Sequence, residues 1–163
     1  MIADGKNTLL KEFGKNGDIL QLWQECYEQF KEQPNDLVRD LRGGSIDEQC
    51  QAIFGYLLDN VTYQEDASGF QWIKSPARLL SDHVGDCKSF TMFIASCLHC
   101  LGVKHIVRFV NFDGGTQYTH VYPVAIDENG YEIILDACEK DRQGYPVYDY
   151  ARPFKKKKDF IYE

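Results

Sequence analysis

One cysteine in this sequence of 163 residues, Cys87, stands where its thiol could act as a nucleophile. It follows Gly85, which tolerates the backbone angles of a tight turn, and Asp86, a strong helix N-cap residue. A helix is therefore predicted to begin at Cys87, with apolar residues at helical spacing and a stop at Gly102. A thiol in the first turn of a helix lies at the positive end of the helix dipole, which favours the thiolate. Cys87 is our candidate nucleophile.

A nucleophilic thiolate needs a base, and His120 together with Asp136 could supply one. Both lie in segments with strand character, joined by a turn sequence at 127–130. A hairpin centred on Glu128 places His120 directly opposite Asp136, on the same face of the sheet. A turn centred half a residue later changes this register, unless a bulge at Gly130 restores it. The spacing thus permits an imidazole–carboxylate hydrogen bond.

These three side chains would together carry out acyl transfer. The thiolate attacks, His120 holds the proton and returns it to the leaving group, and Asp136 fixes the tautomer of the imidazole. The backbone N–H of Cys87 would stabilise the oxyanion. A second oxyanion donor is expected from a side chain, and the sequence does not rank the candidates. They are Tyr63, Gln64, Gln71 and Trp72.

The elements that must position this site follow from caps and hydrophobic periodicity. Helices are predicted after the N-cap residues Asp18, Ser45, Ser75 and Asp86. Extended segments are predicted at 61–64, 103–112, 119–126 and 131–136. Because the helices come first and the antiparallel strands afterwards, the pattern predicts an α+β fold. In this fold the central Cys87 helix packs on an antiparallel sheet.

Length and composition indicate one globular domain over residues 1–163. Its core is expected at about 45–138, with peripheral segments at 1–17 and 150–163. The net charge of −7 argues against a nucleic-acid partner, and the basic run Lys155–Lys158 is interpreted as a solvated tail. No signal peptide and no apolar run long enough to cross a bilayer can be recognised. We therefore expect a cytoplasmic protein without a membrane partner.

The cysteines do not predict a disulfide scaffold or a metal centre. Six in a chain of this length suit a reducing compartment. Cys26 and Cys50 fall within the apolar stripes of predicted helices, where cysteine is a small core residue. Cys97 and Cys100 flank a Leu-His pair late in the central helix, without a second matched pair to complete a zinc site. We expect neither a metal nor a cofactor.

Five short motifs occur in a defined order along the chain. They are Ser75-Pro76-Ala77-Arg78-Leu79-Leu80, Gly85-Asp86-Cys87-Lys88, Leu101-Gly102-Val103, Thr119-His120-Val121-Tyr122 and Leu135-Asp136. With these motifs, residues 45–138 resemble the transglutaminase-like cysteine hydrolase superfamily. The resemblance implies a papain-like core, a triad of Cys87, His120 and Asp136, and acyl transfer on amides. The sequence is most similar to small bacterial and phage members, some of which are associated with virions.

The sequence departs from the pattern of this superfamily at three places. Ser89 stands where an acidic residue is frequent, Val-Tyr follows His120 in place of Ala-Trp, and Ala-Cys follows Asp136 where proline is usual. None of these departures removes a member of the triad. They leave the choice of substrate open.

Three functions are compatible with the sequence. The leading hypothesis is a thiol peptidase or amidase that acts on a peptide or protein through an acyl-enzyme on Cys87. A close variant is a true transglutaminase, in which an amine rather than water accepts the acyl group. The alternative from another class is a binding or phage virion-structural module that keeps the fold without catalysis. Such a module would have virion or other protein partners.

Overall fold

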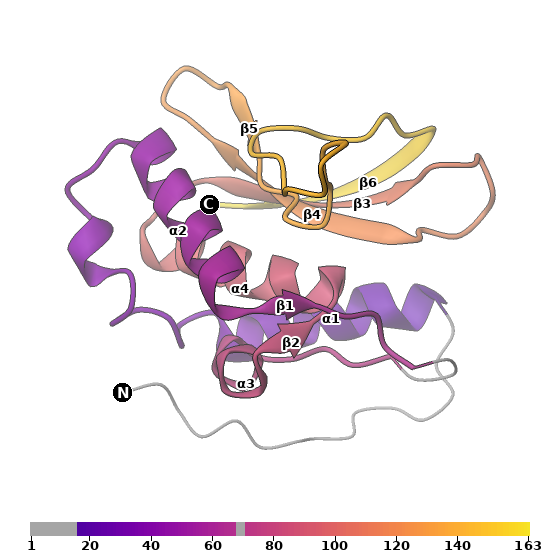
Figure 1. The fold of residues 1–163 in the computed structure, drawn as a ribbon, viewed down its shortest axis with the longest axis horizontal. Helices are drawn as coiled ribbons and strands as arrows, with labels where there is room; N and C mark the ends of the chain where they lie inside the picture. The colour runs from indigo at the N-terminus through magenta and orange to yellow at the C-terminus, as the bar shows by residue number, and fades with distance from the viewer. Residues whose placement is uncertain (1–15, 68–70) are drawn as a thin grey trace.

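The computed structural model describes residues 16–67 and 71–163. Helices in this part of the chain are α1 (Asn16–Phe30), α2 (Ile46–Asn60), α3 (Pro76–Asp82) and α4 (Cys87–Cys100), with a 3-10 turn at Arg39–Leu41. Strands are β1 (Thr62–Tyr63), β2 (Val84–Gly85), β3 (His105–Asn111), β4 (His120–Ile126), β5 (Glu132–Ile134) and β6 (Lys156–Tyr162). The helices lie on one side of the β3–β6 sheet (Figure 1). The predicted α+β architecture is therefore confirmed.

Helix α4 is the centre of the fold, as the sequence predicts. Asp86 caps it, since the carboxylate accepts from the backbone N–H groups of Lys88 and Ser89. The eleven residues from Lys88 to Leu98 are all buried, because other elements surround the helix. The helix stops at Gly102, whose φ of +71° lies in the left-handed region that glycine tolerates. Within α4, only the two ends reach solvent, at Cys87 and at His99 and Cys100.

Two of the other helices also begin where their caps predict. In α2, Ser45 Oγ accepts from the backbone N–H of Glu48 at 3.2 Å, and the Glu48 carboxylate accepts from Ser45 N–H at 2.9 Å. In α3, Ser75 caps the helix and Pro76 occupies its first position. The prediction for α1 is wrong by a few residues, because α1 begins at Asn16 and Asp18 lies inside it. An acidic residue stabilises the whole first turn of a helix, so it does not fix the first residue.

Of the peripheral segment expected at 1–17, residues 1–15 lie outside the described residues, and positions 16 and 17 belong to α1. In the part of the chain that the structure covers, no helix combines the length and the apolar character needed to cross a membrane.

The main sheet has the strand order β5-β4-β3-β6 and is antiparallel throughout. Every residue of β3 is buried, because both faces of this strand are covered. Val107 and Phe109 pack with residues of α1 and α4, whereas Ile106 and Val110 pack with Ala151 and Phe154. The sheet thus forms the middle layer, between the helices and the chain that follows β5.

The interpretation of Lys155–Lys158 as a solvated tail is wrong. Residues 156–162 form β6, which pairs along the whole of β3, from His105 facing Tyr162 to Asn111 facing Lys156. The lysine side chains are exposed, while their backbone groups belong to the sheet. Lysines are typical of edge strands, where their charge discourages pairing with other chains. The lysine-rich composition did not indicate a strand, because lysine has a low strand propensity.

The predicted register of the β4–β5 hairpin is also wrong. Val124 faces Ile134 and Ile126 faces Glu132, so the turn is centred on Asn129 rather than on Glu128. The Asp127 carboxylate fixes this turn by accepting from the backbone N–H groups of Asn129 and Tyr131, each at 2.8 Å. The sequence pattern showed a turn of this type but not which residue would close it. Each residue of β5 consequently faces a residue of β4 two positions away from the predicted one.

Candidate active site

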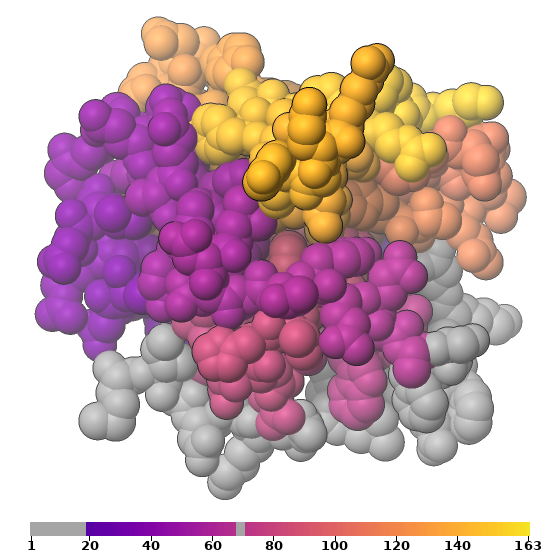
Figure 2. Space-filling model, in the orientation of Figure 1, coloured from indigo at the N-terminus to yellow at the C-terminus, as the bar shows by residue number. Residues whose placement is uncertain are grey.

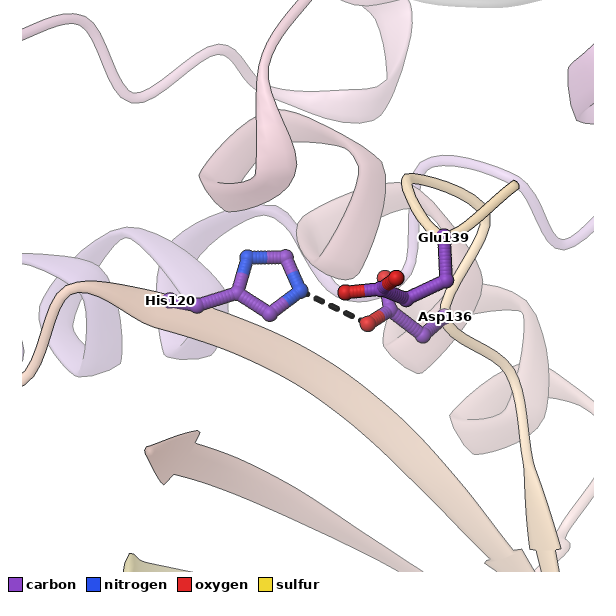
Figure 3. Close-up of side chains that lie close together, drawn as sticks. All are labelled: His120, Asp136 and Glu139. Atoms are coloured by element: carbon purple, nitrogen blue, oxygen red, sulfur yellow. Dashed lines mark hydrogen bonds and ion pairs between the residues drawn. The ribbon is translucent and has the colours of Figure 1, made fainter. Parts of the chain in front are cut away.

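His120 and Asp136 are in contact despite this change of register. His120 Nε2 lies 2.7 Å from Asp136 Oδ2, with the two residues side by side in Figure 3. The other carboxylate oxygen accepts from the backbone N–H of Cys138 at 3.1 Å, and Asp136 is only 2% exposed. Asp136 therefore has fixed partners for both oxygens. Such a carboxylate can hold an imidazole in one orientation.

The even size of the register error explains why the two residues still meet. Extending the observed register places Asp136 opposite Tyr122, so that His120 and Asp136 are diagonal rather than direct neighbours. A shift by two residues keeps every side chain on its predicted face, whereas a shift by one would reverse the face. Diagonal neighbours remain within reach of long side chains. The imidazole spans that diagonal here.

Cys87 is the first residue of α4 and is partly exposed. Asp86 occupies the N–H groups of Lys88 and Ser89, whereas the N–H of Cys87 has no hydrogen-bond partner among the residues described. A donor left open beside the sulfur could bind an oxyanion. Gly85 makes this close turn possible, since a Cβ there would lie 2.4 Å from Leu79 Cδ1. The structure thus provides the predicted helix start with a free donor.

The electrostatics couple His120 to Cys87. Burial alone would lower the pKa of His120, but hydrogen bonds to Asp136 and then to Cys87 outweigh it and raise this pKa to about 10. His120 therefore holds its proton at neutral pH. Since Nε2 faces Asp136, the other ring nitrogen, Nδ1, is left for the thiol. The arrangement suits an ion pair between a thiolate and an imidazolium.

Among the four oxyanion candidates, Tyr63 is the one placed beside the nucleophile. It faces Gly85 in the parallel β1–β2 pair. Burial, followed by negative charge at Cys87, raises the pKa of Tyr63, so the phenol keeps its proton as a donor must. The side chains of the three other candidates are exposed. These are Gln64, Gln71 and Trp72.

Among the residues that the structure describes, the other cysteines and histidines do not belong to a group of three that could hold a metal ion. Cys97 is fully buried, and the Cys100 thiol donates to the backbone oxygen of Lys31 at 3.2 Å. His99 Nε2 lies 2.6 Å from a Glu32 carboxylate oxygen, on the surface. Cys26 and Cys50 are buried in the core, as predicted.

Sequence reasoning missed Glu139, which lies beside the His–Asp pair (Figure 3). His120, Asp136 and Glu139 each offer a ligand atom, and these atoms lie within 4.8 Å of one another. Among the described residues this is the group of three side chains that could hold a metal ion. The imidazole nitrogen on the side of the two carboxylates is Nε2, so a cation there would replace the proton that Nε2 shares with Asp136. Only the short spacing after Asp136 could have drawn attention to Glu139.

The space-filling view shows a hollow on one face of the molecule. On the face drawn in Figure 2, the segment around β1 (magenta) and the chain after β5 (gold) approach each other across a narrow hollow. Atoms in the colour of the region that includes α4 are visible at its base.

Two solved structures share the fold of this chain. A suspected protease from Parabacteroides distasonis has a TM-score of 0.61 at 12% sequence identity, over 77% of this chain and 27% of that chain. This chain thus spans 27% of the length of that protein. Calcium-bound LapG from Legionella pneumophila has a TM-score of 0.51 at 18% identity, over 92% of this chain and 77% of that chain. No family model and no curated protein matches the sequence.

These comparisons agree with the motifs read from the sequence. This chain therefore shares its fold with these two solved structures. At such identities the likeness concerns the fold alone. What the site does must be argued from its own residues.

Proposed function

We propose that this chain is a thiol peptidase or amidase that cleaves a peptide-like amide through an acyl-enzyme on Cys87. The observation that carries the proposal is the contact of His120 Nε2 with Asp136 Oδ2 at 2.7 Å, beside a cysteine at a helix start. The interaction with Cys87 that helps to raise the pKa of His120 supports the same assignment. In this proposal Cys87 is the nucleophile, His120 the acid and base, and Asp136 the residue that orients His120.

Acylation would begin from the thiolate–imidazolium pair. The Cys87 sulfur forms a bond to the amide carbonyl carbon, and the electron pair of the C=O bond moves to oxygen. The Cys87 N–H and the Tyr63 hydroxyl would donate to this oxyanion. The C–N bond then breaks as His120 gives its proton to the leaving amine. Once sulfur has lost its charge, one cause of the raised pKa of His120 is gone, which eases this transfer.

Deacylation would restore the pair. Water attacks the thioester carbon and loses a proton to His120, acting now as a base. The C–S bond breaks, the carboxylic acid departs, and Cys87 is again a thiolate beside an imidazolium. If a primary amine took the place of water, the same steps would give transglutamination.

The proposal predicts that Cys87 is the most reactive of the six cysteines. Iodoacetamide at about pH 6 should alkylate Cys87 faster than the other five, because only a thiolate attacks and few ordinary thiols are ionised there. Mass-spectrometric mapping measures each rate in one sample. Cys97 is the internal control, since burial raises the pKa of its thiol. A Cys87 that reacts no faster than Cys97 would favour a module without catalysis.

A second experiment examines turnover and the acceptor. p-Nitrophenyl acetate should acetylate Cys87, and the thioester should then hydrolyse, whereas Cys87→Ala should give neither step. Adding a primary amine at modest concentration should leave acetate as the main product, because we identify no dedicated amine site. Predominant amide formation would instead indicate a transglutaminase.

A further inference from the structure

Besides Asp136, the imidazole of His120 has an aromatic neighbour, Phe112. The two ring centroids lie 5.8 Å apart, and the ring planes are only 30° from parallel. Aromatic rings attract each other in such an offset, stacked arrangement. Phe112 is half-buried and the His120 side chain is 12% exposed, so much of this contact is shielded from water. The candidate acid and base thus has a flat ring stacked against it.

Strand pairing explains why these two rings meet. Val110 of β3 faces His120 of β4, and Phe112 follows Val110 by two positions, just after the end of β3. Residues two apart along a strand share a face, so Phe112 and His120 are diagonal neighbours on one face of the sheet. Phe112 also packs against the buried cluster that includes Val110 and Tyr122. Its ring is therefore kept on the face that carries His120.

The backbone beside Phe112 is fixed as well. Asn111 is 2% exposed, and its side-chain oxygen accepts from the backbone N–H of Gly114 at 2.6 Å. The backbone oxygen of Asn111 accepts from the N–H of Lys155 at 2.9 Å. The first bond holds the turn that follows β3, and the second brings the segment before β6 next to Phe112.

Arg152 in that segment contacts the Phe112 ring. Its guanidinium carbon lies 4.3 Å from the ring centroid. A cation over an aromatic face is attracted by the negative charge of the π electrons. Ala151 and Phe154 of the same segment pack against the cluster that Phe112 also joins. The chain that follows β5 therefore holds Phe112 in the position where it stacks on His120.

The hydrogen bond to Asp136 does not by itself fix the plane of the imidazole. The torsion about the Cβ–Cγ bond of histidine has broad minima. Nε2, which contacts Asp136 at 2.7 Å, lies closer to the axis of this torsion than Nδ1 does. The bond at Nε2 therefore restrains the torsion less than a contact with the ring face would. A stacked ring opposes the same rotation directly, and this rotation decides where Nδ1 points.

We propose that Phe112, held by Arg152, is a positioning residue for His120: its ring sets the plane of the imidazole and so keeps Nδ1 directed at Cys87. This inference rests on the proposed function. It gives two residues outside the triad a role in the proton transfers of His120, beyond their contribution to packing.

The test compares the alkylation of Cys87 by iodoacetamide at pH 6 and pH 9 in full-length variants. Phe112→Leu keeps an apolar side chain without the flat ring, and it should slow alkylation at pH 6 about three- to tenfold, as expected for the loss of one aromatic pair. At pH 9 the deficit should shrink, because the thiol ionises there without help from the imidazole. Phe112→Tyr keeps the ring and should stay within about twofold of the wild type. A Phe112→Tyr variant as slow as Phe112→Leu, or a deficit equal at both pH values, would overturn the inference.

Deacylation gives a second readout that does not depend on the ionisation of the thiol. After acetylation by p-nitrophenyl acetate, the loss of the acetyl group from Cys87 requires His120 as a base. Phe112→Leu should slow this loss, measured by mass spectrometry, whereas Phe112→Tyr should not. In the same samples the buried Cys97 should stay unalkylated, which shows that each variant is folded.

Arg152 extends the test to an exposed side chain, whose substitution leaves the core intact. Arg152→Met should slow the alkylation of Cys87 at pH 6 about two- to fivefold, because it removes the cation that holds Phe112. Arg152→Lys keeps a cation and should react faster than Arg152→Met. If Phe112→Leu failed to fold, an Arg152→Met variant as reactive as the wild type would still overturn the inference.

Phe160→Leu is the matched control. Phe160 is also half-buried, with Lys158 Nζ at 5.5 Å from its ring centroid and Phe109 edge-on at 5.8 Å. Neither neighbour belongs to the triad, so this substitution should leave the alkylation of Cys87 unchanged. Wild-type rates distinguish the two proposals, since an unreactive wild-type Cys87 contradicts the proposed function. A reactive wild type with an equally reactive, folded Phe112→Leu variant contradicts only the role of Phe112.

Discussion

At the scale of single residues, the site depends on how Asp136 divides its two oxygens. One accepts from the backbone of Cys138 and the other contacts His120 Nε2. The first bond fixes the carboxylate, and the second leaves His120 Nδ1 directed to the thiol. Because this carboxylate is buried, its charge acts on the imidazole with little screening by water. Asp136 should therefore matter for the charge of the ring as well as for its orientation.

This view predicts a graded set of losses once a substrate is available. Cys87→Ala and His120→Ala should each abolish turnover, whereas Asp136→Asn should reduce it about 10²–10⁴-fold, the range for damaged acid–base catalysis. The amide can still hold the ring, but it lacks the negative charge and favours the wrong tautomer. Steady-state rates measure each loss, and circular dichroism checks folding.

The same set of variants tests whether the residues act as a unit. Adding Asp136→Asn to His120→Ala should cost almost nothing further, because residues that share one function are not additive. A folded Asp136→Asn variant with full activity would remove Asp136 from the mechanism.

At the scale of elements, the junction of α3, β2 and α4 sets the place of Cys87. Gly85 lies between the two helices and packs closely against both, near Leu79 of α3 and Ser89 of α4. Leu79 is fully buried and has little room to move away. The absence of a side chain at position 85 is thus what lets α4 begin so near α3.

Gly85→Ala should therefore destabilise the fold by about 1–3 kcal/mol, the usual cost of overpacking. Its new Cβ would lie 2.4 Å from Leu79 Cδ1 and 3.1 Å from Ser89 Cβ. Gly55→Ala is the opposite control, because nothing lies within 4 Å of its Cβ in the middle of α2. It should stabilise by about 0.5–1 kcal/mol. The urea concentrations at the unfolding midpoints compare the two variants. A Gly85→Ala variant as stable as the wild type would mean that the residues around Gly85 move apart to accept the new Cβ.

At the scale of the whole molecule, the buried His105 and the partly buried His120 give stability opposite dependences on pH. His105 Nδ1–H donates to Val103 O, and Nε2 accepts from the Tyr27 hydroxyl, each at 2.8 Å. Burial lowers its pKa to about 4, whereas the pKa of His120 is raised to about 10. One histidine is therefore kept neutral by the fold and the other charged.

The free energy of unfolding should be greatest near pH 6.5, the ordinary pKa of histidine. Below pH 6.5 His105 binds a proton in the unfolded chain but not in the folded protein. The free energy of unfolding therefore falls from pH 6.5 towards 4. Above pH 6.5 folded His120 keeps a proton that the unfolded chain releases, so this contribution is lost from pH 6.5 towards 10. The midpoints of urea unfolding at pH 5, 6.5 and 9 measure the loss of stability on both sides of pH 6.5. In His120→Gln the fall between pH 6.5 and 9 should shrink, and an unchanged fall would assign it to other groups.

The sequence predicted the parts of the fold that depend on neighbours along the chain. The caps at Ser45, Ser75 and Asp86 were predicted at the correct residue, because a cap is a contact over two or three positions. β6 was missed, because its pairing with β3 joins distant segments and its lysines resemble a surface tail. Contacts between near neighbours in the chain could be predicted from the sequence, whereas the pairing of strands from distant segments could not.

The candidate site shows the same division. The His–Asp contact was predicted although the register was wrong, because the error preserved the face of both residues. Glu139 and the contact of Phe112 with His120 were missed, since they depend on how the chain turns after β5 and after β3. A spacing can indicate which residues share a face, but not which loop folds over them.

The position of β6 has a consequence for how the molecule folds. Its partner, β3, is followed by the β4–β5 hairpin and the chain as far as residue 155 before β6 begins. While a ribosome is still adding residues 112–155, one apolar edge of β3 has no strand beside it. An open edge of this kind is where nascent chains associate with one another. Pairing of β3 with β6 is therefore expected to be a late step, and the interval before it is when this protein most needs a chaperone.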